Sequence, residues 1–247
     1  MRKTLLMAGA LLAMTATFAS AAGLELAWNQ CYGQTGSVAM RTSACAANTG
    51  NQAMYASFRP PAGVNAMEGV DVFVDFQTSG GSLGCWWDMS IANPTRNPAL
   101  VGLHVSPADA NGVPLVLCDN HYFLDNGASG GGGMVVTAAD RGQMKGFTAI
   151  AAGLGSPIPA EAQQYAFGFR ITNAATVGAC TGCTKTVCLT LNTINLTSSS
   201  TPTVVLQSPN PGSQNWITFQ GDAQTTGCPG ATPTRNATWG SLKSLYR

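Results

Sequence analysis

The nine residues Gln164-Tyr-Ala-Phe-Gly-Phe-Arg-Ile-Thr172 carry the clearest structural signal in the chain. Tyr165, Phe167, Phe169 and Ile171 occupy alternate positions, and small or polar side chains fill the positions between them. Successive side chains of a β-strand point to opposite faces, so a repeat of two residues is typical of a strand that packs one face on a core. The stretch therefore predicts a half-buried strand.

The same alternation recurs along most of the chain. In the stretch 70–77, valines and a phenylalanine alternate with Asp71, Phe73, Asp75 and Gln77. The shorter alternating runs are Leu24/Leu26/Trp28, Met54/Ala56/Phe58, Val101/Leu103/Val105, Phe147/Ala149/Ala151, Val204/Leu206 and Ile217/Phe219. Clusters rich in Gly, Pro, Ser and Asn separate these runs and predict turns, because such residues supply the backbone angles that turns need. The clusters span 59–63, 78–82, 106–112, 130–133 and 208–212.

The segment 186–198 changes phase in its middle. Val187, Leu189 and Leu191 share one face of an ideal strand, whereas Ile194 and Leu196 share the other. One extra residue in the strand, a β-bulge, produces such a change, and so does a strand that crosses from one sheet to another. The pattern predicts one of these two irregularities.

These patterns favour an all-β chain, because no apolar stripe of helical period extends over four turns. About ten short strands with regular turn signals predict a single antiparallel two-sheet β-sandwich of jelly-roll or immunoglobulin-like type. No internal repeat and no long linker divides the chain. We expect the sandwich to span residues 23–222 and a C-terminal tail to span 223–247.

The first 22 residues have the layout of a secretory signal peptide. Arg2 and Lys3 give a positive head, an apolar run covers 5–18, and four small residues at 19–22 follow. We expect residues 1–22 to be removed and the mature protein to be secreted, periplasmic or on the cell surface. The apolar run is short for a membrane span, so a short membrane anchor is the weaker alternative, and no span is expected in the mature chain.

The charge balance argues against an anionic partner. Without the two cations of the head, ten basic side chains stand against eleven acidic ones. Charged residues make up 9% of the chain, compared with roughly 25% in an average soluble domain. No cluster of Lys or Arg supplies the basic face that nucleic acid or an anionic membrane requires. We therefore expect no nucleic-acid partner.

Eight cysteines in an exported chain predict a fold stapled by disulfide bonds, because their number is even and the compartment is oxidising. They are Cys31, Cys45, Cys85, Cys118, Cys180, Cys183, Cys188 and Cys228. Sequence does not fix their connectivity, but local order suggests the pairs Cys31–Cys45, Cys85–Cys118, Cys183–Cys188 and Cys180–Cys228. The alternative is a zinc site made by the last four cysteines, although zinc ribbons normally have two Cys-x-x-Cys motifs and this chain has one.

Two stretches, 80–84 and 127–131, match the G-x-S-x-G pattern of serine hydrolases. That motif needs a strand before the serine and a helix after it. The residues after Ser82 are of β type, and chance matches are expected in a chain rich in Gly and Ser. A secreted hydrolase with a loop-built site around Ser82, Asp119 and His121 is the alternative function.

Asp71 and Asp75 point to the same side of their predicted strand. Four residues of strand separate their α-carbons by about 13 Å. The two carboxylates of a glycosidase lie roughly 5–9.5 Å apart. We therefore interpret this pair as part of a solvated face.

The stretch 119–127 carries oxygen ligands of the kind that calcium binds, in Asp119 and Asp125, together with His121. Its spacing does not match the D-x-[DN]-x-[DN]-G calcium loop. With the second histidine, His104, the same residues also supply a two-histidine, one-carboxylate set. The simpler interpretation is that Asn and Asp make turns here, so we expect no cofactor and keep calcium as the alternative.

Trp86 and Trp87 are adjacent, so in a strand one of them faces the core and the other does not. Tyr122 and Trp216 are further candidates for an exposed aromatic set. Exposed rings offer a flat apolar surface that stacks on sugars, which suggests a glycan-binding module. The alternative is that the second tryptophan lies under a loop pinned by Cys85.

The chain ends in Thr238-Trp-Gly-Ser-Leu-Lys-Ser-Leu-Tyr-Arg247, which places four large side chains at three- and four-residue steps: Trp239, Leu242, Leu245 and Tyr246. This ending resembles that of uncharacterised exported bacterial β-rich proteins with a T-W-G-x-[LIV]-K-x-L-Y-R tail. The resemblance also touches the opening Leu26-Ala-Trp-Asn-x-Cys31 and Cys180-x-x-Cys183, and it implies no known activity. We expect the tail either to pack on the domain or to act as a sorting or anchoring tag.

The sequence thus favours a non-enzymatic exported β-sandwich with a structural, surface or ligand-binding role. The expected partner is a glycan or another cell-surface protein. A pocket that holds His121 beside a carboxylate and a serine favours the hydrolase instead. A flat face that presents Trp86 or Trp87 favours the binding protein.

Overall fold

The computed structural model describes residues 22–78, 80–96, 99–103, 116–119, 128–209 and 212–221. These residues form eleven strands and one short 3-10 helix, so the expected all-β class is confirmed. The strands are β1 (Gly23–Trp28), β2 (Met40–Arg41), β3 (Asn51–Arg59), β4 (Gly69–Thr78), β5 (Leu100–Leu103), β6 (Ser129–Ala138), β7 (Arg141–Ala149), β8 (Gln164–Thr172), β9 (Val187–Thr197), β10 (Val204–Leu206) and β11 (Trp216–Phe219). The helix is η1 (Cys85–Trp87).

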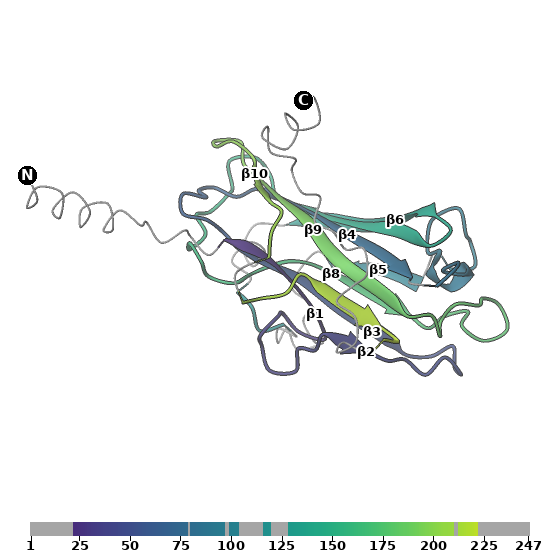
Figure 1. Cartoon of the computed structure of the whole chain (residues 1–247). Coiled ribbons are helices and arrows are strands. Elements are labelled where there is room, and N and C mark those ends of the chain that lie inside the picture. Colours follow the sequence, from purple (N-terminus) through teal and green to yellow (C-terminus); the bar gives the residue numbers. More distant parts are fainter. Residues whose placement is uncertain are drawn as a thin grey trace, which may run out of the picture.

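The strands form the two sheets of a β-sandwich, as expected. The smaller sheet has the order β1-β3-β8-β5, and the larger sheet has the order β2-β11-β9-β4-β7-β6, with β10 beside β9. Figure 1 shows the two layers, with β4, β6 and β9 in one and β1, β3 and β8 in the other. Neighbouring strands are antiparallel except β2 and β11, which run parallel.

Strand β4 lies in the middle of the larger sheet and follows the predicted alternation. Its valines and Phe76 are buried in the core, whereas Asp71, Phe73, Asp75 and Gln77 are partly exposed on the other face. The alternation holds because one face of the sheet packs on the other sheet and the opposite face does not. This opposite face is called the outer face of the larger sheet below.

The phase change in β9 is a β-bulge at Asn192. Val74 of β4 pairs with Leu191, and its neighbour Phe73 pairs with Thr193, so Asn192 has no partner in β4. The extra residue returns Ile194 to the same buried face as Leu191. The first of the two predicted irregularities, a bulge, is therefore the correct one, and β9 stays within one sheet.

The glycine run 130–133 lies in strand β6, so the predicted turn there is wrong. The run is a strand because missing side chains make room for Phe167 of the other sheet. A Cβ atom on Gly102 of β5 or Gly146 of β7 would lie less than 3.0 Å from the Phe167 ring, and one on Gly132 would lie 3.3 Å from it. Glycines of three strands thus surround one ring and let the edges of the two sheets approach each other.

Strand β7 faces the opposite way from its predicted orientation. Gly142, Met144 and Gly146 point into the core with Thr148, whereas the Phe147 side chain is 48% exposed. The sequence interpretation placed the large Phe147 ring in the core. The core position is instead Gly146, because the core needs a glycine there rather than a bulky residue.

Strand β8 is confirmed over the predicted residues, but both of its faces are buried. Its pairing with β3 skips Ala166, because Ala56 pairs with Phe167 and the next residue, Ser57, pairs with Tyr165. The irregularity separates Tyr165 from the face of Phe167. Tyr165 packs instead against Tyr55, with 6.3 Å between the ring centroids.

The disulfide bonds differ from all of the predicted pairs that fall within the described residues. The observed bonds are Cys31–Cys118, Cys45–Cys183 and Cys85–Cys180. They join residues 87, 138 and 95 positions apart in the sequence. The assumption of local pairing failed because a sandwich brings loops that are distant in sequence to the same end. Since Cys180 and Cys183 are oxidised, the alternative zinc site is also wrong.

The predicted signal peptide, apart from Ala22, lies outside the described residues, and so does the tail with Trp239, Leu242, Leu245 and Tyr246. Cys228 lies outside them as well. Where the structure does describe the chain, it contains no helix of the length and apolar character needed to cross a membrane.

The contact between Phe167 and the surrounding glycines gives a stability prediction. Gly146→Ala is expected to lower the free energy of unfolding by about 2 kcal/mol, because the new methyl group overpacks the Phe167 ring. Gly133→Ala is the control, since a Cβ there meets no atom within 4 Å, and its effect should stay within about 0.5 kcal/mol. Urea unfolding measures both. Equal effects of the two substitutions would contradict the packing described here.

Candidate binding face

Side chains of five strands form two rows across the outer face of the larger sheet. Residues paired across neighbouring strands point to the same face, so the pairing registers define each row. The first row is Trp216, Thr190, Asp75, Gln143 and Val135, from β11 to β6. The second row is Thr218, Cys188, Gln77, Arg141 and Ala138. Most of these side chains are polar, unlike those of the buried face.

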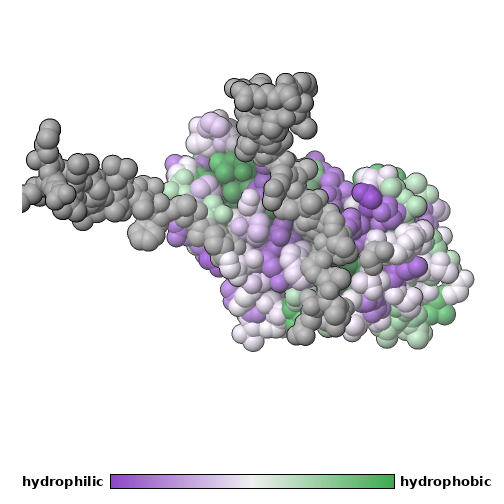
Figure 2. Space-filling view, in the orientation of Figure 1, coloured by the Kyte–Doolittle hydropathy of each residue, from purple (hydrophilic) through white to green (hydrophobic). Residues whose placement is uncertain are grey.

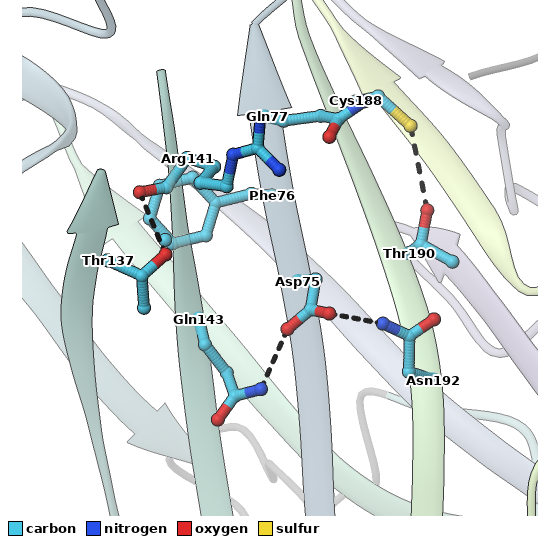
Figure 3. A pocket seen from close by; sticks show the side chains of 10 residues that line it. Asp75, Phe76, Gln77, Thr137, Arg141, Gln143, Cys188, Thr190 and Asn192 are labelled. Atoms are coloured by element: carbon cyan, nitrogen blue, oxygen red, sulfur yellow. Dashed lines mark hydrogen bonds between the residues drawn. The ribbon is translucent and has the colours of Figure 1, made fainter. Parts of the chain in front are cut away.

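A hollow of about 300 Å³ lies where these two rows cross β4, β7 and β9. We refer to it below as the hollow. Its walls are Asp75, Phe76, Gln77, Thr137, Arg141, Gly142, Gln143, Cys188, Thr190 and Asn192. Figure 3 shows that the polar ends of Asp75, Gln143 and Asn192 point toward one another there. The hollow thus presents carboxylate, amide, hydroxyl and guanidinium groups at one place.

Asp75 is the hub of this arrangement. Gln143 Nε2 of β7 donates a hydrogen bond of 2.8 Å to Asp75 Oδ1. Asn192 Nδ2 of β9 donates a second hydrogen bond to Asp75 Oδ2. The bulge places Asn192 on this face, which illustrates how a bulge re-aims a side chain at a site. Each carboxylate oxygen keeps acceptor capacity for a further donor.

Arg141 brings the positive charge of the hollow, and its neighbour Asp140 orients it. Arg141 Nη2 lies 2.9 Å from Asp140 Oδ2, and Arg141 Nε lies 3.1 Å from Oδ1. The hydrogen bonds to Asp140 raise the pKa of Arg141, and the same contact lowers the pKa of Asp140. Both groups therefore stay charged near neutral pH. The pair is exposed, so it fixes a direction for the guanidinium more than it stabilises the fold.

The outer face continues beyond the hollow into an aromatic and charged area. Phe147 is 48% exposed, and its cross-strand neighbour is Asp71. Lys145 Nζ lies 3.6 Å from Asp71 Oδ1 and 5.0 Å from the centroid of the Phe73 ring. The predicted solvated face around Asp71 and Asp75 is thus observed, with Asp71 bound to a lysine and Asp75 to two amides.

Glu25 of the smaller sheet is a buried carboxylate with its own partners. This carboxylate is 1% exposed and forms an ion pair of 3.0 Å with Arg59. Gln163 Nε2 donates both to Glu25 Oε2, at 2.5 Å, and to the Tyr32 carbonyl, at 2.8 Å. The chain at Tyr32 therefore lies over the buried carboxylate, and these bonds hold it there.

Trp86 and Trp87 are both buried, so neither is the exposed ring that adjacent positions in a strand predict. They belong to the 3-10 helix η1 rather than to a strand. A tighter backbone turns both rings inward, where they pack against Phe76 and Phe219. Neither ring can stack on a ligand at the surface.

Arg96 closes the end of the core above this tryptophan pair. Its guanidinium carbon lies 4.5 Å from the centroid of the Trp86 ring. It donates to the carbonyls of Trp86 and Thr172, each at 3.1 Å, and to that of Ala174. Burial lowers the pKa of Arg96 to about 10. Arg96 thus holds loops together with backbone acceptors instead of binding a carboxylate.

Trp216 is the one predicted aromatic ligand residue that the structure places near the hollow. It is partly exposed on the outer face and pairs with Thr190, which lines the hollow. Tyr122 lies outside the described residues.

The residues of the alternative hydrolase do not come together as predicted. Asp119 bonds through its backbone to Gln163 and Tyr165 at the start of β8. Ser82 is exposed and precedes η1, which contacts the segment after the end of β8 through the bond from Trp86 N to the Thr181 carbonyl. A strand of nine residues spans about 26 Å, so Ser82 and Asp119 lie at opposite ends of the sandwich.

The remaining metal and hydrolase residues give no further support to those hypotheses. His104, His121 and Asp125 lie outside the described residues. No group of three or more His, Cys, Asp or Glu side chains within the described ranges is arranged to hold a metal ion. The second G-x-S-x-G stretch runs into β6 rather than into a helix, because Ser129 is the first residue of that strand.

The face of the molecule seen in Figure 2 is largely hydrophilic or neutral, and its hydrophobic residues gather in small separate patches. Such patches are ordinary on a soluble surface.

No protein-family model matches the sequence, and no curated protein matches it. Two similar solved structures are both of the second type II cohesin module from the adaptor ScaA scaffoldin of Acetivibrio cellulolyticus. One is 8% identical, with a TM-score of 0.36 over 78% of this chain and 94% of that chain. The other, with its long C-terminal linker, is 11% identical, with a TM-score of 0.36 over 88% and 97% of the two chains. Likeness this slight supports no inference about function.

Sequence patterns did not reveal the hollow, although one signal pointed to it. Asp75 and Gln143 read as ordinary outward positions of two strands, and only pairing of β4 with β7 joins them. The phase change in 186–198 marked the place where β9 departs from regular pairing. It did not tell which residue the bulge would send outward.

Two buried threonines give a prediction about paired and unpaired polar groups. Thr218 Oγ1 is buried and has no hydrogen-bond partner among the described residues, whereas Thr176 Oγ1 accepts from Trp86 Nε1 at 2.7 Å and donates to the Asn173 carbonyl at 2.6 Å. Thr218→Val should therefore raise the free energy of unfolding by about 1 kcal/mol, and Thr176→Val should lower it by at least as much. Thermal or urea unfolding measures both. A loss at Thr218 as large as that at Thr176 would refute the prediction.

Proposed function

We propose that the protein is an exported β-sandwich that binds a hydroxyl-rich ligand, a glycan, on the outer face of its larger sheet. The observation that carries the proposal is the carboxylate of Asp75 held between the amides of Gln143 and Asn192 in an open hollow. A carboxylate accepts hydrogen bonds from sugar hydroxyls, and an amide side chain can both accept from them and donate to them.

Two aromatic residues support a glycan over a small ion. Phe147 and Trp216 lie on the same face, with Phe147 about half exposed and Trp216 partly exposed. Rings of this kind give a flat apolar surface that packs on the apolar face of a sugar. A ligand that covers several sugar units has room to reach from the hollow to Phe147, because Asp75 and Asp71 are four residues apart on β4.

The make-up of the hollow supports binding rather than hydrolysis. Its described lining contains one carboxylate, Asp75. Hydrolysis of a glycosidic bond by the common mechanism uses two, roughly 5–9.5 Å apart.

Export is the second part of the proposal. The chain has three disulfide bonds among its described residues, and such bonds form and persist in oxidising compartments. The signal-peptide pattern of residues 1–22 supports the same destination: the exterior, the periplasm or the cell surface.

A glycan array with the full-length exported protein tests the proposal, followed by calorimetric titration with the strongest ligand. Asp75→Asn and Phe147→Ala should each weaken binding about tenfold, which corresponds to about 1.4 kcal/mol. Asp119→Asn is the matched control, because Asp119 is exposed at the far end of β8 and should leave affinity unchanged. An array without any ligand for the folded protein, or equal affinities of all three variants, would count against the proposal.

A further inference from the structure

We infer that two copies of this protein associate through strand β6, whose free edges pair antiparallel across a two-fold axis. The contact is made by the second half of the strand, residues 133–138, which are called the β6 edge below. The occupant of the β6 edge is the β6 edge of a second copy of this chain. The inference does not rest on glycan binding.

Strand β6 ends the larger sheet, because it pairs only with β7. Figure 1 shows it at the margin of its layer. Among the described residues, the ten residues of β6 make no backbone hydrogen bond outside the pairing with β7. The N–H and C=O groups on the free side of an edge strand are a template for pairing with another chain. The strand therefore offers a row of unpaired donors and acceptors.

The other edges of the two sheets are short or already paired. Strand β2, at the opposite end of the larger sheet, has two residues, and β10 beside β9 has three. In the smaller sheet, β5 has four residues. Loops close the edge of β1, because its N–H groups donate to the carbonyls of Ser208, Gln214 and Val38. Of the edges in the described part of the chain, β6 is the one that is both long and open.

The composition of β6 lacks the usual protection of an exposed edge. Natural edge strands avoid unwanted pairing through charged side chains, especially Lys, and through Pro. Neither occurs in the β6 sequence SGGGGMVVTA. Instead, Val135 and Val136 are 52% and 36% exposed. The pairing irregularity of β6 falls at Thr137, beside the turn into β7, so the strand is regular through Val136. This edge is suited to a partner strand rather than to water.

Strand β5 confines the pairing to the second half of β6. A Cβ atom on Gly102 of β5 would lie 3.0 Å from Gly132 N, so β5 lies against the backbone of β6 at that residue. Beyond it, Met134 is half-buried and the other residues of the β6 edge are exposed. In an antiparallel pair, every second pair of residues exchanges two hydrogen bonds. Six residues therefore form about six hydrogen bonds with a partner strand.

A second copy is the partner that the chemistry of the β6 edge fits. Two-fold symmetry places the same surface on both sides of a contact, and like charges directly opposite each other in a sheet are destabilising. The β6 edge has no charged side chain, so two copies meet without repulsion. With Val135 on the axis, Val135 faces its own counterpart and Met134 faces Val136. The large side chains of the edge thus meet apolar ones.

The size of this contact predicts a weak dimer. Interfaces contain about one hydrogen bond per 100–200 Å², so about six bonds correspond to roughly 600–1,200 Å². Interfaces of this area belong to transient complexes. Because each copy uses its one β6 edge, the assembly closes as a dimer. The two larger sheets then form one continuous sheet, whose outer face carries two copies of the hollow on the same side.

Sedimentation equilibrium of the full-length protein tests the association between about 10 μM and about 1 mM, the range for a transient contact. The weight-average mass should rise from that of the monomer toward that of the dimer. Val135→Lys should raise the dissociation constant about tenfold, because it places two like charges across the axis. Val205→Lys is the matched control and should leave the constant unchanged, since Val205 is 51% exposed on β10, away from β6.

Hydrogen exchange at the two ends of this concentration range gives a second readout. Backbone amides of residues 133–138 should exchange more slowly in the concentrated sample, because pairing protects them, whereas those of β10 should not change. A mass that stays monomeric at 1 mM would overturn the inference. So would equal effects of the two lysine variants, protection that appears only outside β6, or growth beyond the dimer. Each of these results is independent of whether the protein binds a glycan.

Discussion

The β-bulge at Asn192 is the constraint on which the candidate site depends, and it accommodates an extra residue of β9 without disturbing the core. One unpaired residue lets β9 bury Leu191 and Ile194 on the same face despite their odd spacing. The same residue sends its amide to Asp75 on the outer face. Bulges are common beside sites because they re-aim a side chain without a change in the rest of the sheet. Here the irregular position of β9 is also the residue that donates to Asp75, the hub of the hollow.

Close packing between the two sheets holds in place the larger sheet, which contains the bulge. Phe167 fits between Gly102, Gly132 and Gly146, so the free edges of the two sheets approach each other at β5 and β6. The disulfide bonds fasten the loops: Cys85–Cys180 and Cys45–Cys183 both hold the segment between β8 and β9. The strands of the larger sheet thus have a rigid support on one face, and the other face lies outside the core between the sheets.

Local pattern was enough to predict the class and most strands, because alternation records which face of a strand is buried. The pattern in β4 and the irregularity in β9 were both readable for this reason. The glycines of β6 suggested a turn, and Phe147 suggested the wrong buried face for β7. Both predictions failed because the Phe167 ring, which comes from the other sheet, requires glycines beside it. Disulfide pairing and the contact of Asp75 with Gln143 depend on which strands become neighbours, and a single sequence does not contain that information. The prediction that one of Trp86 and Trp87 is exposed failed for a local reason. In a 3-10 turn, unlike a strand, successive side chains do not alternate between two faces.

The crystal structure of a variant that lacks Asn192 tests the central claim, that one residue of β9 builds the hollow without being needed by the core. Deletion restores strict alternation in β9, with Thr193 directly after Leu191. We predict that β4 and β9 then pair without a break, that Leu191 and Ile194 stay in the core, and that Asp75 loses its amide partner from β9. A variant that fails to fold, or one that places Ile194 on the outer face, would contradict the account.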